Sequence, residues 1–322
     1  MSYIFFYSFL IITNLILLII IPKITKKYNL YDFPNERKLH TDPISYLGGL
    51  FFFLSHFFYF FYFQNIFFES HTLLLNWSNI FSLILISTLI FFLGLLDDKY
   101  DLPPLKKSII LILLISSSIL IDDTLLIKSL NFEIFDKILI LKNFSLLFTI
   151  ICIYIFINAC NMYDGTDLQL GIYFLVLLFY LYYKTNYFHF LTPILIPLIF
   201  FLFTNLRRIN FFGNNGSHFL GYLLALLIIK FYNLKLFNSV EEVIAIMLVP
   251  GLDLIRLFFY RISKNKKFFE SDLNHIHHIL NKNGNKYKTQ LIIFILNLSP
   301  IIIGEVFKTY FLGIICGTIF YI

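Results

Sequence analysis

The chain has few charged residues, few cysteines and no motif for binding nucleic acid. Asp, Glu, Lys and Arg together make up 14% of its 322 residues, whereas soluble domains carry about 25%. Its cysteines, Cys152, Cys160 and Cys316, lie in or beside apolar runs, and none belongs to a CxxC pair. We therefore expect no disulfide, zinc or iron–sulfur site. With neither an aromatic–basic RNA motif nor a helix-turn-helix pattern, we also expect no nucleic-acid partner.

Long apolar runs fill most of the chain. Hydrophobic residues make up 59% of the sequence, and the runs include Ile4 to Ile21, Ile80 to Leu96 and Ile109 to Ile121. A membrane-spanning helix needs about 20 apolar residues, because an unpaired backbone cannot cross hydrocarbon. By that measure the sequence holds about 11 spans. It predicts an all-α, polytopic integral membrane protein whose residues 1–322 form one transmembrane domain.

The basic residues predict how the spans are oriented. No Lys or Arg precedes Lys23, so the first run lacks the charged start of a cleaved signal peptide. The loops that carry polar motifs hold 18 of the 25 Lys and Arg residues. Because basic loops stay in the cytoplasm, we expect a multi-pass protein of the inner (plasma) membrane, with its N-terminus outside and its motifs facing the cytoplasm. The net charge of +6 then reflects topology signals and lipid-headgroup contacts.

Polar clusters lie at the ends of the apolar runs. They are Lys38 to Pro43, Asp97 with Asp98, Asn158 to Asp167, Gly213 to Gly221, and Asp253 to His278. If the runs cross the membrane alternately, these clusters all reach the same face. An enzyme that joins a water-soluble substrate to a lipid would require this arrangement.

Asp97 and Asp98 follow the third run, within the sequence Gly94-Leu-Leu-Asp-Asp-Lys-Tyr-Asp. Adjacent carboxylates repel each other at a membrane surface unless a cation or a basic group is near. Mg²⁺ binds one or two carboxylates together with substrate phosphates, so the pair suits half of a metal site. The alternative is a helix end that carries two solvated acids.

Asn158, Asn161 and Asp164 are spaced three residues apart after a long apolar run. If the helix continues, their side chains share one face and can hold a metal and a phosphate ester. Gly165 would let the chain turn and would place Asp167 elsewhere, where it could accept hydrogen bonds from a base or a ribose. A polar helix cap followed by a turn is the alternative.

Two further clusters suit phosphate. Gly213 to Gly221 forms a glycine-rich turn that opens a helix, and the free N–H groups of such a helix bind phosphate, although any loop entering a helix shares this pattern. His275, His277 and His278 lie in a polar loop with Arg261. Their spacing does not suit zinc, and we expect them to neutralise charge on phosphoryl oxygens. A solvated basic loop is the alternative.

Together the clusters resemble the polyprenyl-phosphate N-acetylhexosamine-1-phosphate transferase family. This family includes bacterial enzymes that start lipid-linked envelope glycans and the phospho-N-acetylmuramoyl-pentapeptide transferases. The motifs that carry the resemblance are Arg37-Lys-Leu-His40, Leu96-Asp97-Asp98, Asn158-Ala-Cys-Asn161-Met-Tyr-Asp164-Gly165-Thr-Asp167 and His275-Ile-His277-His278. The last motif is similar to the branch that uses UDP-N-acetylhexosamines.

The resemblance implies an enzyme that uses Mg²⁺, with Mn²⁺ as the alternative cofactor. It would transfer a sugar 1-phosphate from a UDP-sugar to undecaprenyl (polyprenyl) phosphate. The sugar 1-phosphate that the resemblance implies is N-acetylhexosamine 1-phosphate. It would release UMP and so initiate a cell-envelope glycan such as O-antigen. The residues that the resemblance makes catalytic are Asp97, Asp98 and Asp164. Those that would bind the metal are Asn161 and Asn214. Those that would bind the substrates are His40, Lys107, Asn158, Asp167, Ser217, Arg261, His275, His277 and His278.

Four positions depart from the family's pattern. Asn214 stands where the family usually has a metal-binding Asp, Leu168 stands where it has Gly, and Tyr46 and Leu273 stand where it has Arg. An Asn oxygen can still bind Mg²⁺ but brings no charge, so a catalytically silent lipid-binding relative is one alternative. A membrane transporter is another, although transporters bind their substrates near mid-membrane rather than at span ends. The sequence leaves open which donor sugar is used, which polymer is made downstream, and whether the protein forms a homodimer.

Overall fold

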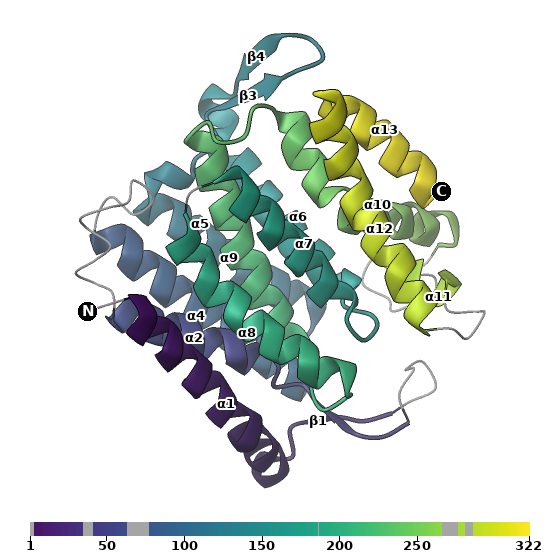
Figure 1. The fold of residues 1–322 in the computed structure, drawn as a ribbon. Coiled ribbons are helices and arrows are strands. Elements are labelled where there is room, and N and C mark those ends of the chain that lie inside the picture. The colour runs from purple at the N-terminus through teal and green to yellow at the C-terminus, as the bar shows by residue number, and fades with distance from the viewer. Residues whose placement is uncertain (1–2, 35–40, 63–76, 186, 266–275, 281–285) are drawn as a thin grey trace. The chain divides into compact units, whose positions relative to one another are not determined.

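A computed structural model describes residues 3–34, 41–62, 77–185, 187–265, 276–280 and 286–322 of the chain. Within these residues, 11 helices are between 12 and 26 residues long (Figure 1). Of the helices described, 6 are long and apolar enough to cross a membrane, and several shorter helices are also apolar. The predicted all-α, polytopic membrane fold is confirmed.

The chain divides into two compact units, each built from two segments. The first unit comprises Met1–Asp123 and Leu181–Leu224, and the second comprises Thr124–Tyr180 and Ala225–Ile322. The helices α7 (Gln169–Lys184) and α9 (Gly213–Asn233) each contribute residues to both units.

The first unit is a bundle of apolar helices joined by a short hairpin. Its elements are α1 (Tyr3–Tyr28), β1 (Tyr31–Asp32), β2 (Ile44–Ser45), α2 (Gly49–Tyr62), α4 (Trp77–Tyr100), α5 (Pro104–Ile121), α8 (Phe188–Leu206), the end of α7 and the first part of α9. Helix α8 packs on α1 and α2, while α4 packs on α2 and α5. Aromatic rings fill the interior: Phe53 stacks on Phe91 with 4.3 Å between ring centroids, and Phe52 stacks on Phe212.

The loop before α2 holds the start of α9 in place. Strand β1 pairs with β2, and Ser45 of β2 also bridges to Asn210. The Phe211 N–H donates to the Ser45 carbonyl at 2.7 Å, and the Gly48 N–H donates to the Phe211 carbonyl at 2.9 Å. The residues on either side of Gly48 therefore lie beside the first turn of α9.

The second unit is built around α10. Its elements are η1 in part (Asp123–Leu125), β3 (Ser129–Phe132), β4 (Lys137–Ile140), η2 (Lys142–Phe144), α6 (Ser145–Tyr163), most of α7, the last part of α9, α10 (Val240–Ser263), α11 (Ile276–Leu280), α12 (Lys286–Phe307) and α13 (Tyr310–Tyr321). Helix α10 packs on α6, α12 and α13, and α12 lies beside α13 (Figure 1). A Cβ at Gly313 would lie 2.2 Å from the Pro300 carbonyl oxygen, so this close approach of α13 to α12 requires glycine.

Local sequence signals set the helix ends that frame the motifs. Helix α4 stops where Asp101 adopts a φ of 49°, and α5 then starts at Pro104, as prolines favour first helical positions. Helix α10 starts after Ser239, whose hydroxyl accepts the Glu242 N–H at 3.3 Å. This Ser-x-x-Glu spacing is the sequence signature of a capped helix start.

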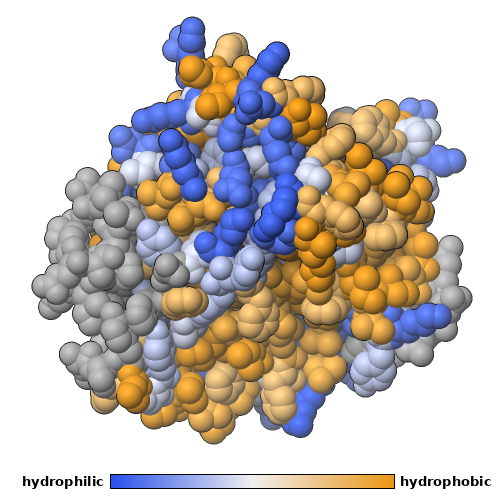
Figure 2. All heavy atoms as spheres, turned by 45° about the horizontal axis from the view of Figure 1, so that its top comes forward, coloured by the Kyte–Doolittle hydropathy of each residue, from blue (hydrophilic) through white to orange (hydrophobic). Residues whose placement is uncertain are grey.

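Large apolar side chains remain on the outside of the helices. On α6, Leu147, Ile151 and Ile155 are exposed and recur every four residues, so they form one stripe along the helix. Figure 2 shows hydrophobic side chains over broad areas of the face in view. Such a surface suits lipid rather than water as its solvent.

Candidate functional site

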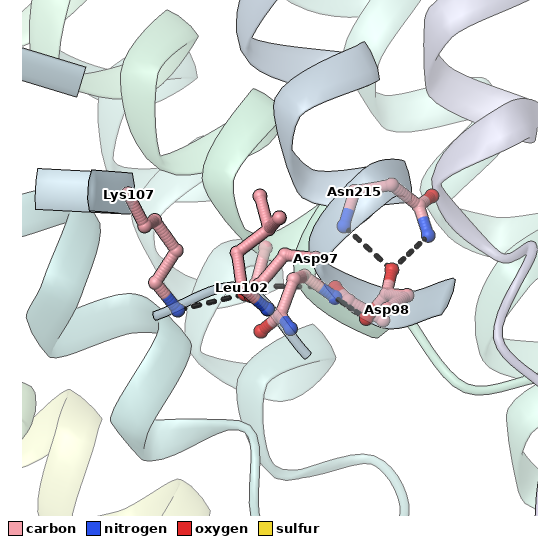
Figure 3. Close-up of polar contacts among 8 residues, drawn as sticks. Asp97, Asp98, Leu102, Lys107 and Asn215 are labelled. Carbon is pink, nitrogen blue, oxygen red and sulfur yellow. Dashed lines mark hydrogen bonds and ion pairs between the residues drawn. The ribbon is translucent and has the colours of Figure 1, made fainter. Parts of the chain in front are cut away.

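The acidic pair lies in the last turn of α4, and its two carboxylates have different partners. The Lys107 ammonium forms an ion pair with Asp97 Oδ2 at 2.7 Å, and the Leu102 N–H donates to Asp97 Oδ1 at 3.1 Å (Figure 3). The Asp97 side chain is only 4% exposed. Lys107 is therefore the basic group that a buried carboxylate next to a second carboxylate requires.

Asp98 binds the N-terminus of α9. Its Oδ1 accepts the Asn214 N–H at 2.7 Å, and its Oδ2 accepts the Asn215 N–H at 3.1 Å and the Asn215 side-chain amide at 2.7 Å (Figure 3). The first N–H groups of a helix have no partner within the helix and carry its positive end. We expected these groups to suit phosphate, and in this structure a carboxylate of the chain itself engages them.

Glycines bring three helices together around this contact. Gly213 has a φ of +66°, and a Cβ there would lie 2.7 Å from Asp98 Oδ2. A Cβ at Gly94 of α4 would lie 2.5 Å from the Asn214 carbonyl oxygen, and one at Gly49 of α2 would lie 2.1 Å from Asn215 Oδ1. The backbones of α2 and α4 can approach the start of α9 only because these positions have no side chain.

The side chains around the start of α9 differ in how firmly they are held. The Asn214 side chain is half-buried and makes no hydrogen bond within the described part of the chain. Ser217 is buried, and its hydroxyl donates to the Gly213 carbonyl at 3.0 Å. The Tyr46 carbonyl accepts the Asn215 amide at 2.6 Å. Burial and the nearby Asp98 raise the pKa of Tyr46 to about 12, so its phenol is neutral at pH 7.

The amide motif of the second unit lies at the end of α6. The helix ends at Tyr163, so Asn158 and Asn161 occupy its last turns and Asp164 caps it, with φ −80° and ψ 62°. All three motif side chains are half-buried. The Asn158 Nδ2 donates to the carbonyl of Tyr154 at 2.8 Å. The side chains are therefore partly accessible, as a ligand site requires.

The turn after α6 is fixed by a neighbouring helix. Gln290 of α12 donates from its side-chain amide to the carbonyl of Asp167, which is buried. The left-handed residue of this turn is Leu168, with a φ of 68°, rather than Gly165. In the family that the chain resembles, Gly usually occupies this position. The left-handed backbone conformation explains that preference, because glycine adopts it without strain.

Asp253 begins the polar cluster that ends at His278, but the sequence alone assigned it no role. It is 1% exposed within α10, and its Oδ1 accepts the Arg256 guanidinium at 2.8 Å, the Tyr321 hydroxyl at 2.8 Å and the Ile276 N–H at 3.1 Å. The last contact holds the start of α11, the short helix of the histidine motif. An acid in the middle of an apolar stretch of a membrane span is itself a functional signal, and it could have assigned a role to Asp253.

The remaining predicted residues are described to different extents. Arg261 is buried near the end of α10. His40 and His275 lie outside the described residues, and only the backbone of His277 and His278 is described, within α11. The first unit thus brings together Asp97, Asp98, Lys107, Asn214 and Ser217. The second unit contains Asn158, Asn161, Asp164, Asp167 and Arg261.

Carboxylate and amide oxygens are the donor atoms that the described site residues could offer to a cation. Among the described residues, no group of three or more His, Cys, Asp and Glu side chains is placed to hold a metal. The oxygens of Asp98 and Asn214 lie on adjacent helix ends, since the Asn214 N–H contacts Asp98. Carboxylate and amide oxygens, few in number, suit Mg²⁺ that completes its shell with substrate phosphates and water.

Comparison with known proteins defines the class of this protein. Residues 80–232 match the model of glycosyl transferase family 4. The chain is 24% identical over 275 residues to the undecaprenyl-phosphate alpha-N-acetylglucosaminyl 1-phosphate transferase of Escherichia coli strain K12. It is 25% identical over 276 residues to the protein of the same name from Salmonella typhimurium strain LT2. Both alignments cover 81% of this chain and 72% of the relative.

With its helical fold, these matches identify the chain as a multi-pass membrane protein of the phosphosugar transferase class. They also confirm the resemblance to the polyprenyl-phosphate N-acetylhexosamine-1-phosphate transferase family. The matched residues 80–232 include the acidic pair, the amide motif and the start of α9.

Proposed function

We propose that this chain transfers N-acetylhexosamine 1-phosphate from a UDP-sugar to polyprenyl phosphate, with release of UMP. The observation that carries the proposal is the acidic pair at the end of a membrane span, with Asp97 paired to Lys107 and Asp98 seated on the start of α9. The relatives named as undecaprenyl-phosphate transferases support undecaprenyl phosphate as the acceptor. The basic loops support a reaction at the cytoplasmic face of the inner membrane.

The reaction joins two anions, so the protein must offset their repulsion. An oxygen of the acceptor phosphate attacks the phosphorus that carries the sugar. The bond from that phosphorus to the bridging oxygen breaks, and UMP leaves with the electron pair. Lys107 is suited to the acceptor phosphate because an ammonium has three donors and its side chain is 20% exposed. One donor can stay on Asp97 while another binds a phosphate oxygen.

Asp98 and Asn214 fit a Mg²⁺ site in the first unit. The Asp98 carboxylate is oriented by three hydrogen bonds, of which Oδ1 accepts one, and no residue that the structure describes bonds to the Asn214 side chain. Bound Mg²⁺ would neutralise charge on the phosphate oxygens of the substrates. In the second unit, Asn161 and Asp164 offer the same kinds of oxygen donor.

The second unit supplies the groups proposed for the nucleotide. Asp167 would accept hydrogen bonds from the uridine, and Gln290 would keep its turn in place. Arg261 and the histidine motif would bind phosphate, and Asp253 would position the helix that carries His277 and His278. Asp253 contacts the backbone of that helix, so we assign it a positioning role.

The experiment that tests the proposal is a product analysis with the purified full-length chain in lipid vesicles. The vesicles contain undecaprenyl phosphate, and UDP-N-acetylglucosamine and Mg²⁺ are added. We expect UMP and a sugar-diphosphate lipid in equal amounts. Release of UDP would show that the sugar moves without its phosphate and would overturn the proposal. The absence of product with every UDP-amino sugar tested would favour the silent relative.

A further inference from the structure

A β-hairpin precedes α6 and lies at the opposite end of that helix from the amide motif (Figure 1). Strands β3 and β4 pair in antiparallel register, with Asn131 opposite Ile138 and Leu130 opposite Leu139. Helix α6 has 19 residues, which corresponds to about 28 Å, close to the thickness of a bilayer core. The hairpin therefore lies at the membrane surface opposite to the one that Asn161 and Asp164 face.

Polar contacts fix the hairpin to α9, α10 and their connection within the second unit. The Asn131 N–H donates to the Tyr232 hydroxyl at 2.8 Å, and the Asn131 side chain donates to the Asn238 carbonyl at 2.7 Å. The Glu133 N–H donates to the Glu241 carboxylate at 3.0 Å. These contacts come from α9, from the α9–α10 connection and from α10, and they involve Asn131 and Glu133, whereas all residues of β4 stay exposed.

The outward surface of the hairpin is apolar. Phe135 in the turn is 65% exposed, and Ile138 and Ile140 of β4 are 67% and 65% exposed. Ile138 and Ile140 are two residues apart in a strand, so they point from the same face. Ile134 and Leu139 are also exposed, at 44% and 53%, so five large apolar side chains of this short hairpin are exposed, on both faces of β4. Their exposure to water is costly, at about 25 cal/mol for each Å² of apolar surface.

This apolar surface continues into the lipid-facing side of α6. Phe144 follows the hairpin and is 71% exposed, and Leu147 begins the exposed stripe along the helix. Lys137 and Lys142 are exposed beside it and can reach lipid phosphates. Asp136, also exposed, lies at the turn, and its charge would keep the turn at the level of the headgroups.

We propose that the β3–β4 hairpin inserts Phe135, Ile138 and Ile140 into the headgroup–acyl boundary of the leaflet opposite to the motif-bearing face. The partner is the lipid bilayer. Because the hairpin is joined to α6 through η2, its insertion fixes the depth of α6 in the membrane. The depth of Asn161 and Asp164 at the other end of α6 is fixed with it.

Fluorescence quenching by brominated lipids tests the proposal. The chain contains only one tryptophan, Trp77, so a single substitution removes the native fluorophore. In a Trp77→Phe background, Phe135→Trp and Ile138→Trp each place a single fluorophore on the hairpin. Leu147→Trp is the matched control on the lipid-facing stripe of α6. Full-length variants are placed in vesicles whose acyl chains carry bromine near the headgroup or near the methyl end. Circular dichroism and thermal unfolding are compared with those of the Trp77→Phe parent.

We expect blue-shifted emission from both hairpin tryptophans and strong quenching by bromine near the headgroup, since interfacial segments lie roughly 5–10 Å into the boundary. Aqueous iodide should quench them little. Strong iodide quenching with none by brominated lipid would overturn the proposal. Blue emission that neither reagent quenches would also contradict it, because a protein surface such as a second copy would then cover the hairpin. Using two positions keeps the test valid if one variant does not fold.

Discussion

At the scale of single residues, Asp98 has both a structural and a proposed catalytic role. It accepts hydrogen bonds from two backbone N–H groups and one side-chain amide at the start of α9. Hydrogen bonds to a carboxylate at a helix N-terminus are stronger than neutral ones. Its replacement should therefore change the stability of the first unit as well as the reaction.

Asp98→Asn should reduce transfer more than tenfold, a loss of about 1.4 kcal/mol or more in transition-state stabilisation. It should also lower the free energy of unfolding by about 1–3 kcal/mol, because the new amide nitrogen faces N–H donors and leaves them unpaired. UMP release and thermal unfolding measure the two effects. Asp101→Asn is the matched control. It removes an exposed acid from the same turn, and Asn tolerates its φ of 49°. Equal losses in both variants would contradict a specific role for Asp98.

Leu168 holds a backbone conformation that disfavours its side chain. A left-handed backbone conformation costs a residue other than glycine about 1–2 kcal/mol. Replacement by glycine removes this strain, but the greater entropy of glycine in the unfolded chain offsets part of the stability gained. Leu168→Gly should therefore leave stability unchanged or raise it by up to about 1 kcal/mol. The measurement is thermal unfolding in detergent.

The control for this prediction is Leu147→Gly, which removes an exposed leucine from a right-handed helix and should cost about 1 kcal/mol. If Leu168→Gly destabilises the protein as much as Leu147→Gly does, the strain at residue 168 is absent.

At the residue scale, the sequence predicted candidate groups but not the partners that they contact. Asp97 and Asp98 became candidates because they are adjacent acids in an apolar chain, and Lys107 became one through the family resemblance. The contact between Asp98 and Asn214 joins residues 116 positions apart, and no local pattern encodes such a pair. Asp253 was recognised only as the first residue of a polar cluster, because no local pattern encodes its contact with Ile276, 23 positions away.

At the scale of elements, the close approach of α2 and α4 to α9 places the acidic pair. Glycines at positions 49, 94, 213 and 216 line this approach, and in each case an added Cβ would meet backbone or side-chain atoms at 3.0 Å or less. The sequence predicted that Gly213 begins a helix, because glycine-rich turns are local signals. It could not predict that Gly94 faces that turn, because periodicity gives a face of a helix but not its neighbour.

Gly94→Ala should force α4 away from α9, because its Cβ would lie 2.5 Å from a backbone oxygen. We expect a loss of about 1–3 kcal/mol in stability and reduced transfer, since Asp98 would lose its contact with the Asn214 N–H. Gly251→Ala in α10 is the matched control, because a Cβ there meets nothing within 4 Å. The control should be neutral or gain up to about 1 kcal/mol in unfolding measurements. Similar results for the two variants would rule out tight packing at Gly94.

At the scale of the whole molecule, the distribution of Lys and Arg predicts which ends of the helices face the cytoplasm. Among the described residues, 6 helices are long and apolar enough to cross a membrane and others are shorter, so the 11 spans expected from the sequence stay a prediction. The long spans could be predicted because bilayer thickness sets the length of an apolar run. The division into two compact units could not be predicted, since it depends on contacts between segments far apart in the chain.

A cysteine introduced at Asp101 should be shielded from impermeant thiol reagents in intact cells, and one at Asn238 should react. Asp101 is exposed in the turn after the acidic pair, and Asn238 is exposed between α9 and α10, on the side of the hairpin. Labelling is scored before and after the cells are opened. Reaction of the Asp101→Cys protein in intact cells would reverse the proposed orientation.

The central claim is that this chain catalyses phosphosugar transfer with the help of Mg²⁺, and Asn214 is the position that tests it most directly. The measurement is UMP release by the wild-type protein and by Asn214→Asp over a series of Mg²⁺ concentrations, with UDP-N-acetylglucosamine and undecaprenyl phosphate present. Because an added carboxylate strengthens Mg²⁺ binding, we expect metal-dependent release from both proteins and a lower half-maximal Mg²⁺ concentration for Asn214→Asp. UMP release that neither protein shows at any Mg²⁺ concentration would contradict the account.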